Sequence, residues 1–275
     1  MKKGNEIHSL FLYIRSMAYK IIFIDIDWTI LDHNKHDWDY DTIDVLKRLQ
    51  EDKILIYLCT ARPYDSIVHT GIFNIFHPDG IICTNGGVVF VGDKLISANI
   101  IPEDVVRTIE KISNKHHLTL ELSTNKERYF TSKVNKYVKE YFSVFAETIP
   151  DIRKYHNKEV SAILLFAPEK YDEQLIKEFP KETNYIRFDN HGVDVTYFKN
   201  NKGEGIKKVL EYLGIDKKDS IGAGDDISDI PMFKEVGLSI ALGNGKEEAK
   251  AAADIVCDHI GNNGLGKALQ IIFPE

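Results

Sequence analysis

The stretch KIIFIDIDWTILD, residues 20–32, decides the fold class of this chain. Its first part is almost continuously apolar and rich in β-branched residues, which is typical of a strand buried on both faces of a parallel sheet. Two aspartates, Asp25 and Asp27, stand where this strand should end and the chain should turn. The stretch therefore predicts a central strand of an open α/β sheet with acidic side chains at its carboxyl end.

Strands and helices are predicted to alternate after this stretch. Apolar residues at helical spacing over 41–50 precede apolar, strand-like runs at 54–59 and 80–83. Close to the C-terminus, a helical segment at 202–213 precedes another strand-like run at 220–224. This alternation predicts an α/β fold whose core is a Rossmann-like, doubly wound parallel sheet.

The middle of the chain follows a different pattern. A hairpin is expected around Gly92 and Asp93, and a mixture of helices and strand-like stretches follows it. This organisation indicates an inserted α+β domain. We therefore divide the chain into an N-terminal extension (1–17), a first core segment (18–87), an inserted cap domain (88–190) and a second core segment (191–275).

The N-terminal extension carries apolar residues on one predicted helical face, at Ile7, Leu10, Phe11 and Ile14. The apolar run is too short and too interrupted for a signal peptide or a membrane span. We interpret the segment as an appendage that precedes the domain, and a helix for self-association is the alternative.

Composition excludes some classes of function. The 275 residues carry a formal net charge of -7, whereas a nucleic-acid-binding protein usually presents a basic face. The three cysteines are widely spaced and form no CxxC pair, so neither a disulfide framework nor a zinc site is expected. We expect a cytoplasmic protein, a monomer or weak homodimer, that contacts neither nucleic acid nor membrane.

Two acidic motifs are predicted to meet on the sheet. Side chains of a strand alternate between faces, so Asp25 and Asp27 should point to the same side. The sequence Asp225-Asp226-Ile227-Ser228-Asp229 forms a second acidic cluster after a predicted strand. Carboxylates gathered at one edge repel each other unless a cation or a proton intervenes, and a hard divalent cation is a natural solution. Helix capping by aspartate is the simpler alternative for each motif.

A hydroxyl and a lysine complete the set of candidates. Thr60 ends the predicted strand at 54–59, with Ala61 and Arg62 after it, and Lys202 opens the predicted helix at 202–213. A hydroxyl beside backbone amides suits a phosphate oxygen. Each residue taken alone is better explained as a helix cap or a solvated lysine.

The order of these elements resembles that of the haloacid dehalogenase superfamily, and more narrowly the Cof-type phosphatases, whose large α/β (C2-type) cap lies between the second and third motifs. The matching pieces are IDIDWTILD, CTAR, TNGG, NKGEGI and GAGDDISDIPMF. The resemblance covers essentially residues 18–275.

The resemblance implies catalytic roles for four residues. Asp25 would be the nucleophile that attacks phosphorus, and Asp27 would protonate the leaving oxygen and then activate water. Thr60 would bind the phosphate, and Lys202 would neutralise Asp25 and the transferring group. Phosphoryl transfer depends mostly on positioning and charge neutralisation, which agrees with this distribution of charged groups.

The resemblance also implies a Mg²⁺ site and substrate contacts. Asp25, the backbone carbonyl of Asp27 and Asp225 would hold the metal, and Asp229 would ligate it through water or support Lys202. Substrate contacts would come from Trp28, Ala61, Arg62, Asn85 and Ser228.

Two residues depart from the family pattern, and one motif resembles a family hinge. Trp28 stands where glycine is usual, and we expect its indole to project towards the cap, against substrate or the inner face of the cap. Ser228 stands where asparagine is usual, which puts the substrate contact there in doubt. The sequence Asn85-Gly86-Gly87 resembles the first hinge of the cap, with the return crossing expected near 190–193.

These features predict a Mg²⁺-dependent hydrolase of small phosphate monoesters, such as a sugar phosphate, a nucleotide or a phosphorylated cofactor, that works through an aspartyl-phosphate intermediate. Two alternatives remain open. A phosphomutase would return the phosphoryl group to a sugar, and a non-catalytic sensor would only bind the phosphorylated ligand.

Overall fold

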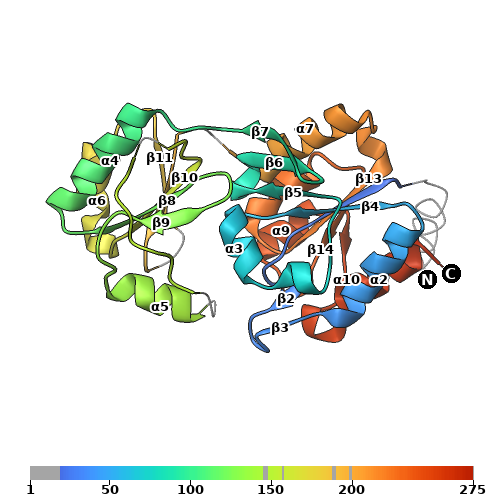
Figure 1. Ribbon diagram of the computed structural model, residues 1–275. Coiled ribbons are helices and arrows are strands. Elements are labelled where there is room, and N and C mark those ends of the chain that lie inside the picture. Colours follow the sequence, from blue (N-terminus) through green and yellow to red (C-terminus); the bar gives the residue numbers. More distant parts are fainter. Residues whose placement is uncertain (1–18, 145–147, 157, 188–189, 198–199, 275) are drawn as a thin grey trace.

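The computed structural model describes residues 19–144, 148–156, 158–187, 190–197 and 200–274. The chain forms two lobes that lie side by side (Figure 1). The predicted extension at 1–17 lies outside the described residues. Within them, no helix combines the length and apolar character needed to cross a membrane, and all three cysteines are free.

The larger lobe is built on an eight-stranded sheet in the order β15-β14-β13-β1-β4-β5-β6-β7. Its first six strands are parallel. Their bounds are Ile21–Ile24 (β1), Leu55–Cys59 (β4), Gly80–Cys83 (β5), Ser220–Gly224 (β13), Leu238–Ala241 (β14) and Ile255–Val256 (β15). The predicted doubly wound core is confirmed.

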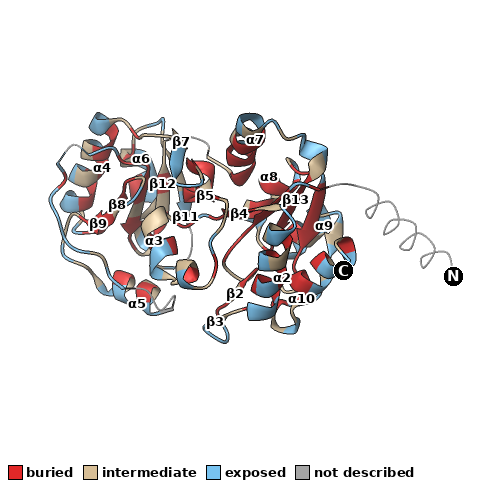
Figure 2. Cartoon of the chain, turned by 45° about the vertical axis from the view of Figure 1, so that its right-hand side comes forward, coloured by how far each residue is buried: buried red, intermediate tan, exposed pale blue. Residues whose placement is uncertain are grey.

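Helices cover both faces of this sheet (Figure 2). The side chains of β1 alternate, so Ile22 and Ile24 enter one apolar cluster while Ile21 and Phe23 enter another. The first cluster is closed by α2 (Tyr40–Glu51), α3 (Tyr64–His69) and α10 (Gly264–Ile272). The second is closed by α7 (Lys202–Leu213), α8 (Ile230–Phe233) and α9 (Glu247–Ala252). Burial on both faces explains the continuous apolar run of β1.

The predicted start of the inserted domain at residue 88 is wrong. The hairpin of β6 (Val88–Val91) and β7 (Lys94–Ala98) forms around Gly92, as expected, but β6 pairs antiparallel with β5. The hairpin therefore extends the core sheet. Its alternating pattern is the same whichever sheet it joins, so the sequence could not place it.

The smaller lobe is the cap, a five-stranded sheet in the order β11-β12-β10-β8-β9 whose neighbours are all antiparallel. Its strands are β8 (Thr119–Ser123), β9 (Arg128–Phe130), β10 (Ala162–Phe166), β11 (Asn184–Arg187) and β12 (Val193–Thr196), and its helices are α4 (Glu103–Lys115), α5 (Lys136–Val144) and α6 (Asp172–Glu178). The predicted end of the insertion at residue 190 is also wrong, because β12 pairs with β10 and β11 in this sheet.

The two chain segments that connect the lobes lie next to each other. Asn99, which follows β7, donates a side-chain hydrogen bond to Asn200 at 2.7 Å. The Asn85-Gly86-Gly87 segment is therefore not the hinge we expected, since it joins β5 to β6 inside the core. Gly86 has φ 87° there, and a Cβ on it would lie 2.1 Å from the carbonyl oxygen of Asn201. The glycine lets this turn pack against the start of α7.

Short elements complete the fold. The two-stranded ribbon of β2 (Leu31–Asp32) and β3 (Asp37–Trp38) follows the first acidic motif. The short 3₁₀ helices are η1 (Ile72–Asn74), η2 (Thr84–Gly86), η3 (Glu169–Tyr171), η4 (Lys217–Asp219), η5 (Ile227–Asp229) and η6 (Ile260–Asn262).

Candidate active site

The predicted site residues meet at the carboxyl ends of the central strands. Asp25 follows β1, Thr60 follows β4, Asp225 follows β13, and Lys202 is the first residue of α7. All four line one cavity of about 410 Å³ between the core and the cap. Neighbouring parallel strands end at the same edge of a sheet, which is where open α/β sheets bind their ligands.

Lys202 lies between two carboxylates. Its Nζ atom is 2.8 Å from Oδ1 of Asp25 and 2.5 Å from Oδ1 of Asp229. All three side chains are buried. Burial disfavours the charged form of Lys202 and by itself would lower its pKa. The two carboxylates outweigh this effect and keep the pKa above its ordinary value. Lys202 is therefore a fixed positive charge beside the predicted nucleophile.

Asp229 is held by donors from the protein. Its Oδ2 atom accepts hydrogen bonds from the backbone N–H groups of Asp225 and Asp226, each at 2.9 Å, while Oδ1 faces Lys202. Of the two roles that we expected for Asp229, this arrangement favours support of Lys202 over ligation of a metal. A Cβ on Gly224 would lie 2.3 Å from Cγ of Asp229, so only glycine allows this close approach.

Three carboxylates surround one lysine at this site. Oxygen atoms of Asp25, Asp225 and Asp229 lie within 4.8 Å of one another. Burial raises the pKa of Asp25 to about 7 despite Lys202. Burial and the neighbouring carboxylates raise the pKa of Asp225 to about 8. With Lys202 counted, the ionised cluster has two negative charges in excess. The hard oxygen donors and this charge fit a divalent cation such as Mg²⁺.

Asp225 is held in position by the hydroxyl of Thr29 and by a backbone hydrogen bond. Thr29 Oγ1 lies 3.4 Å from Asp225 Oδ1 as a donor, and the N–H group of Lys246 donates to the carbonyl oxygen of Asp225 at 2.8 Å. Sequence reasoning missed both contacts, although Thr29 belongs to the same motif as Asp25.

Asp27 has different partners from those expected. Arg62 donates to it from Nε at 2.8 Å and from Nη2 at 2.6 Å, and Nε2 of His33 lies 2.6 Å from its Oδ1 atom. Burial alone would raise the pKa of Asp27, but Arg62 and His33 together hold it well below the ordinary value. Asp27 is therefore ionised in this conformation, and Arg62, which we expected to contact substrate, positions Asp27.

The remaining predicted residues divide into two groups. Thr60, Ala61 and Ser228 line the cavity, and Thr60 Oγ1 accepts a hydrogen bond from the N–H group of Arg62 at 3.1 Å. Asn85 is not among the residues that line it, whereas its neighbour Thr84 is. The turn at this point has left-handed backbone at both residues, which sends their side chains in directions that strand alternation does not predict.

Trp28 lines the cavity from the core. Its φ is 57°, in the left-handed region of the backbone that glycine adopts most easily. This conformation explains why glycine is the usual residue of the family at this position. The carbonyl oxygen of Trp28 accepts a hydrogen bond from Nδ2 of Asn244 at 2.8 Å. The indole contacts the ring of His33, with centroids 5.1 Å apart. We expected the indole to project towards the cap; Trp28 lines the cavity between core and cap, and its ring also contacts this core histidine.

We expect Trp28→Gly to keep hydrolysis of a small aryl phosphate within about tenfold of the wild type, because the backbone groups of the loop remain. A non-glycine residue in the left-handed region costs about 1–2 kcal/mol. Trp28→Ala should therefore be less stable than Trp28→Gly by about 1 kcal/mol, since both lose the indole but only alanine retains the strain. Thermal unfolding and steady-state kinetics test this. Complete inactivity of a folded Trp28→Gly protein would mean that the side chain itself positions the loop.

An ion pair between a buried arginine and a partly exposed aspartate joins the cap to the core. Nε of Arg128, on β9, donates to Oδ2 of Asp65, on α3, at 2.9 Å. The Arg128 side chain is only 3% exposed, and its guanidinium lies 5.1 Å from the centroid of the Phe142 ring. Both Arg128 and Ser66 of α3 line the cavity. The pair thus holds the cap over the site.

We expect Asp65→Asn to loosen this closure. A hydrogen bond to a charged group contributes about 1.5–3 kcal/mol, so opening of the cap should become at least about tenfold more frequent. Deuterium uptake should increase in β9 and α3 but not in β14. The exposed Asp93→Asn change at the β6–β7 turn is the matched control. Unchanged uptake in β9 would show that the pair does not hold the two lobes together.

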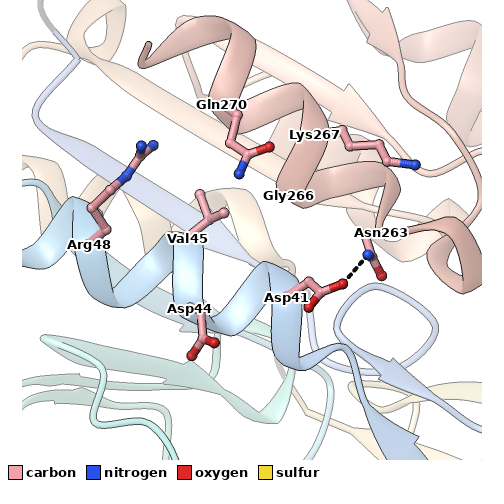
Figure 3. Close-up of a pocket in the computed structure, with 8 residues that line it drawn as sticks. All are labelled: Asp41, Asp44, Val45, Arg48, Asn263, Gly266, Lys267 and Gln270. Carbon is pink, nitrogen blue, oxygen red and sulfur yellow. Dashed lines mark hydrogen bonds between the residues drawn. The ribbon is translucent and has the colours of Figure 1, made fainter. Parts of the chain in front are cut away.

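A second hollow of about 380 Å³ lies between α2 and α10 (Figure 3). Asn263 there donates a side-chain hydrogen bond to Asp41, at the start of α2. None of the described residues that line this hollow belongs to the predicted site. The catalytic candidates all belong to the cavity under the cap.

Comparison with known families identifies the class of protein. The family described as haloacid dehalogenase-like hydrolase matches residues 22–269. The chain therefore belongs to the haloacid dehalogenase superfamily, and the predicted resemblance is confirmed.

Particular relatives narrow the class. The chain is 28% identical over 256 residues to a putative phosphatase, YkrA, of Bacillus subtilis, covering 92% of this chain and 98% of the relative. A crystal structure of a hypothetical protein from Geobacillus kaustophilus has a TM-score of 0.84 and 26% identity, covering 92% of this chain and 99% of that chain. The subclass IIB sugar phosphatase BT4131 has a TM-score of 0.77 and 26% identity, covering 91% and 98% of the two chains. The chain is a Cof-type phosphoric monoester hydrolase.

Proposed function

We propose that this protein hydrolyses small phosphate monoesters with Mg²⁺, through an aspartyl-phosphate intermediate on Asp25. One observation carries the proposal. Asp25 directly follows the central strand β1, and its carboxylate lines the cavity 2.8 Å from Lys202 and beside Asp225. A nucleophile, a fixed positive charge and a second metal-ligating carboxylate therefore share one small volume.

The first step forms a bond between an Asp25 oxygen and phosphorus while the bond from phosphorus to the ester oxygen breaks. In the second step, water attacks the phosphorus of the aspartyl phosphate, which releases inorganic phosphate and restores the carboxylate. Covalent catalysis by a carboxylate divides one difficult displacement into two easier ones. Lys202, fixed by Asp25 and Asp229, stabilises negative charge on the transferring group in both steps.

The proton for the leaving oxygen comes from Asp27, which takes a proton back from the attacking water. Asp27 is ionised while Arg62 donates two hydrogen bonds to it. We infer that a bound phosphate competes for the guanidinium of Arg62, which weakens its hold on Asp27 and raises the pKa of this carboxyl. His33, whose Nε2 atom lies 2.6 Å from Oδ1 of Asp27, remains as a partner that holds this carboxyl in place.

The metal would be held by the carboxylates of Asp25 and Asp225, with the backbone carbonyl of Asp27 as a further ligand. When bound there, Mg²⁺ would supply positive charge to the phosphate oxygens and would help to orient the phosphoryl group. The excess negative charge of the buried carboxylates supports this assignment.

The substrate class remains that of a small phosphorylated metabolite. A cavity of about 410 Å³ lies within the usual range for small-molecule sites. A relative in Bacillus subtilis that is 23% identical is named 5-amino-6-(5-phospho-D-ribitylamino)uracil phosphatase, and BT4131 is named a sugar phosphatase. These names favour sugar phosphates, nucleotides or phosphorylated cofactors over phosphoproteins.

Release of inorganic phosphate from a chromogenic aryl phosphate, measured with and without Mg²⁺, tests the proposal. We expect turnover with the metal and none in its absence. A folded protein that releases no phosphate from an aryl phosphate or from a panel of phosphorylated metabolites would contradict it.

A further inference from the structure

The central strand of the cap sheet, β10, presents a row of apolar side chains to the cavity. Ile163 and Leu165 point into the apolar cluster under α4 and α6. Ala162, Leu164 and Phe166 alternate with them and therefore point to the opposite face of the sheet, and all three line the cavity. The wall that the cap contributes to the cavity is thus apolar in its middle.

Tyr141 of α5 extends this row. Its ring lies edge-on to the ring of Phe166, with centroids 5.6 Å apart, and it also lines the cavity. We call Ala162, Leu164, Phe166 and Tyr141 the apolar strip. Phe166 is fully buried, whereas Leu164 and Tyr141 are only half-buried. These two side chains therefore keep apolar surface that a ligand in the cavity can cover, and covering such surface favours binding.

Polar side chains border the strip without interrupting it. Glu121 on β8 and Asp194 on β12 are the register partners of Leu164 on its two sides, and both line the cavity. Burial raises the pKa of Asp194 to about 7, so this carboxyl can donate as well as accept a hydrogen bond near neutral pH. The wall therefore combines an apolar centre with polar groups along its edges.

A sugar ring fits this wall poorly. The hydroxyl groups of a polyol project around the whole ring, and hydroxyls placed against Leu164 would lose their hydrogen bonds to water without gaining new partners. A planar aromatic ring has two apolar faces and carries its polar groups at its edge. One face can lie on the strip beside Tyr141 while the edge reaches the bordering carboxyl groups. Contacts between aromatic rings add to the effect of the buried area.

We propose that the cap selects phosphate monoesters whose alcohol part carries a planar aromatic ring, with the apolar strip as the surface that binds this ring. The inference rests on the proposed function, since the phosphate of the same molecule must lie at Asp25, and Asp25 and the strip line the same cavity. It narrows the substrate class to nucleotides and aromatic phosphorylated cofactors, and it places simple sugar phosphates outside that class.

Four ligands that share a six-membered ring joined to phosphate through one methylene group test the inference. They are benzyl phosphate, pyridoxine 5′-phosphate, cyclohexylmethyl phosphate and glucose 6-phosphate. Calorimetric binding to the full chain with Asp25→Asn, in Mg²⁺, avoids turnover, and the contribution of the shared phosphate cancels in a ratio of affinities.

We expect both aromatic ligands to bind at least about tenfold more tightly than glucose 6-phosphate, and benzyl phosphate to bind more tightly than cyclohexylmethyl phosphate. A smaller preference over glucose 6-phosphate would overturn the inference. Equal binding of benzyl and cyclohexylmethyl phosphate would also overturn it, because a surface that is merely apolar does not distinguish a planar ring from a puckered one.

Variants then assign the preference to the strip. Leu164→Asn keeps the size of the side chain but makes it polar, and it should lower the affinity for benzyl phosphate relative to glucose 6-phosphate. Tyr141→Leu removes the ring but stays apolar, and it should lower the affinity for benzyl phosphate relative to cyclohexylmethyl phosphate. Ile176→Asn is the matched control, since this side chain on α6 is 58% exposed and does not line the cavity. Ratios that persist in both folded strip variants would overturn the inference.

The inference and the proposed function can fail separately, because binding is measured apart from catalysis. A protein that prefers the aromatic ligands but releases phosphate from none of the four would contradict the proposed function alone. A protein that hydrolyses these esters but binds them without preference would contradict the role of the strip alone.

Discussion

Replacement of Asp25 by asparagine is expected to lower kcat for an aryl phosphate by about a thousandfold or more, a loss of roughly 4 kcal/mol in transition-state stabilisation. Asparagine is nearly isosteric with aspartate but cannot form a stable acyl phosphate. Asp25 lines the cavity beside Lys202, whereas Asp229, the other carboxylate in contact with Lys202, is not among the described residues that line it. Steady-state kinetics on a folded variant, checked by circular dichroism, gives the measurement.

A matched control comes from the same lobe. Asp44 on α2 has a side chain that is 74% exposed, so Asp44→Asn makes the same chemical change away from the cavity and should leave kcat unchanged. Turnover close to the wild-type rate by a freshly purified, sequence-verified Asp25→Asn protein would exclude covalent catalysis at this position.

Removal of the metal is expected to have the second large effect. Chelation by EDTA should abolish activity, and Mg²⁺ should restore it, whereas Ca²⁺ should restore little because its coordination is longer and looser. Asp225→Asn should raise the Mg²⁺ concentration needed for half-maximal activity by at least about tenfold, since even partners outside the first coordination shell contribute this much. Full activity in metal-free buffer would refute the site.

Stability gives a readout of the metal that does not depend on activity. The folded protein raises the pKa of Asp25 to about 7 and of Asp225 to about 8, above the ordinary value of about 4. Between the ordinary pKa of about 4 and the raised values of about 7 and 8, Asp25 and Asp225 bind more protons in the folded state than in the unfolded state. The contribution of these two carboxyls to the stability of the folded protein therefore falls as pH rises through this range. Mg²⁺ should therefore raise the melting temperature more at pH 8 than at pH 5. If Mg²⁺ raised the melting temperature equally at pH 5 and pH 8, the carboxylate cluster would not be the metal site.

The group of catalytic candidates at the carboxyl ends of the core strands was predictable, because each one belongs to a short sequence motif. The buried strand β1, the aspartates after it and the helix that begins at Lys202 all follow from short patterns of polarity and propensity. Parallel strands end at a common edge, so residues distant in sequence were expected to meet there. The structure brings together Asp25, Thr60, Lys202 and Asp225 in this way.

Other features depended on pairing between distant segments. The hairpin β6–β7 has the same alternation whether it extends the core or the cap, and only the partner strand β5 assigns it to the core. His33 follows the motif by a few residues, but no pattern shows that its ring would contact both Asp27 and Trp28. The pairing of Arg62 with Asp27 likewise needed the geometry of two separate loops.

The class of chemistry can be inferred from residue types and their order, because an aspartate pair, a lysine and a second acidic motif at strand ends define which groups are available. How these groups are used depends on the packing of the folded chain. In the folded protein, Asp229 contacts Lys202 and Arg62 donates hydrogen bonds to Asp27. Glu121 and Asp194 of the cap line the cavity. The physical reason is that charge and residue type are properties of the chain, whereas burial, distance and the pKa of each group arise only when segments far apart in sequence pack together.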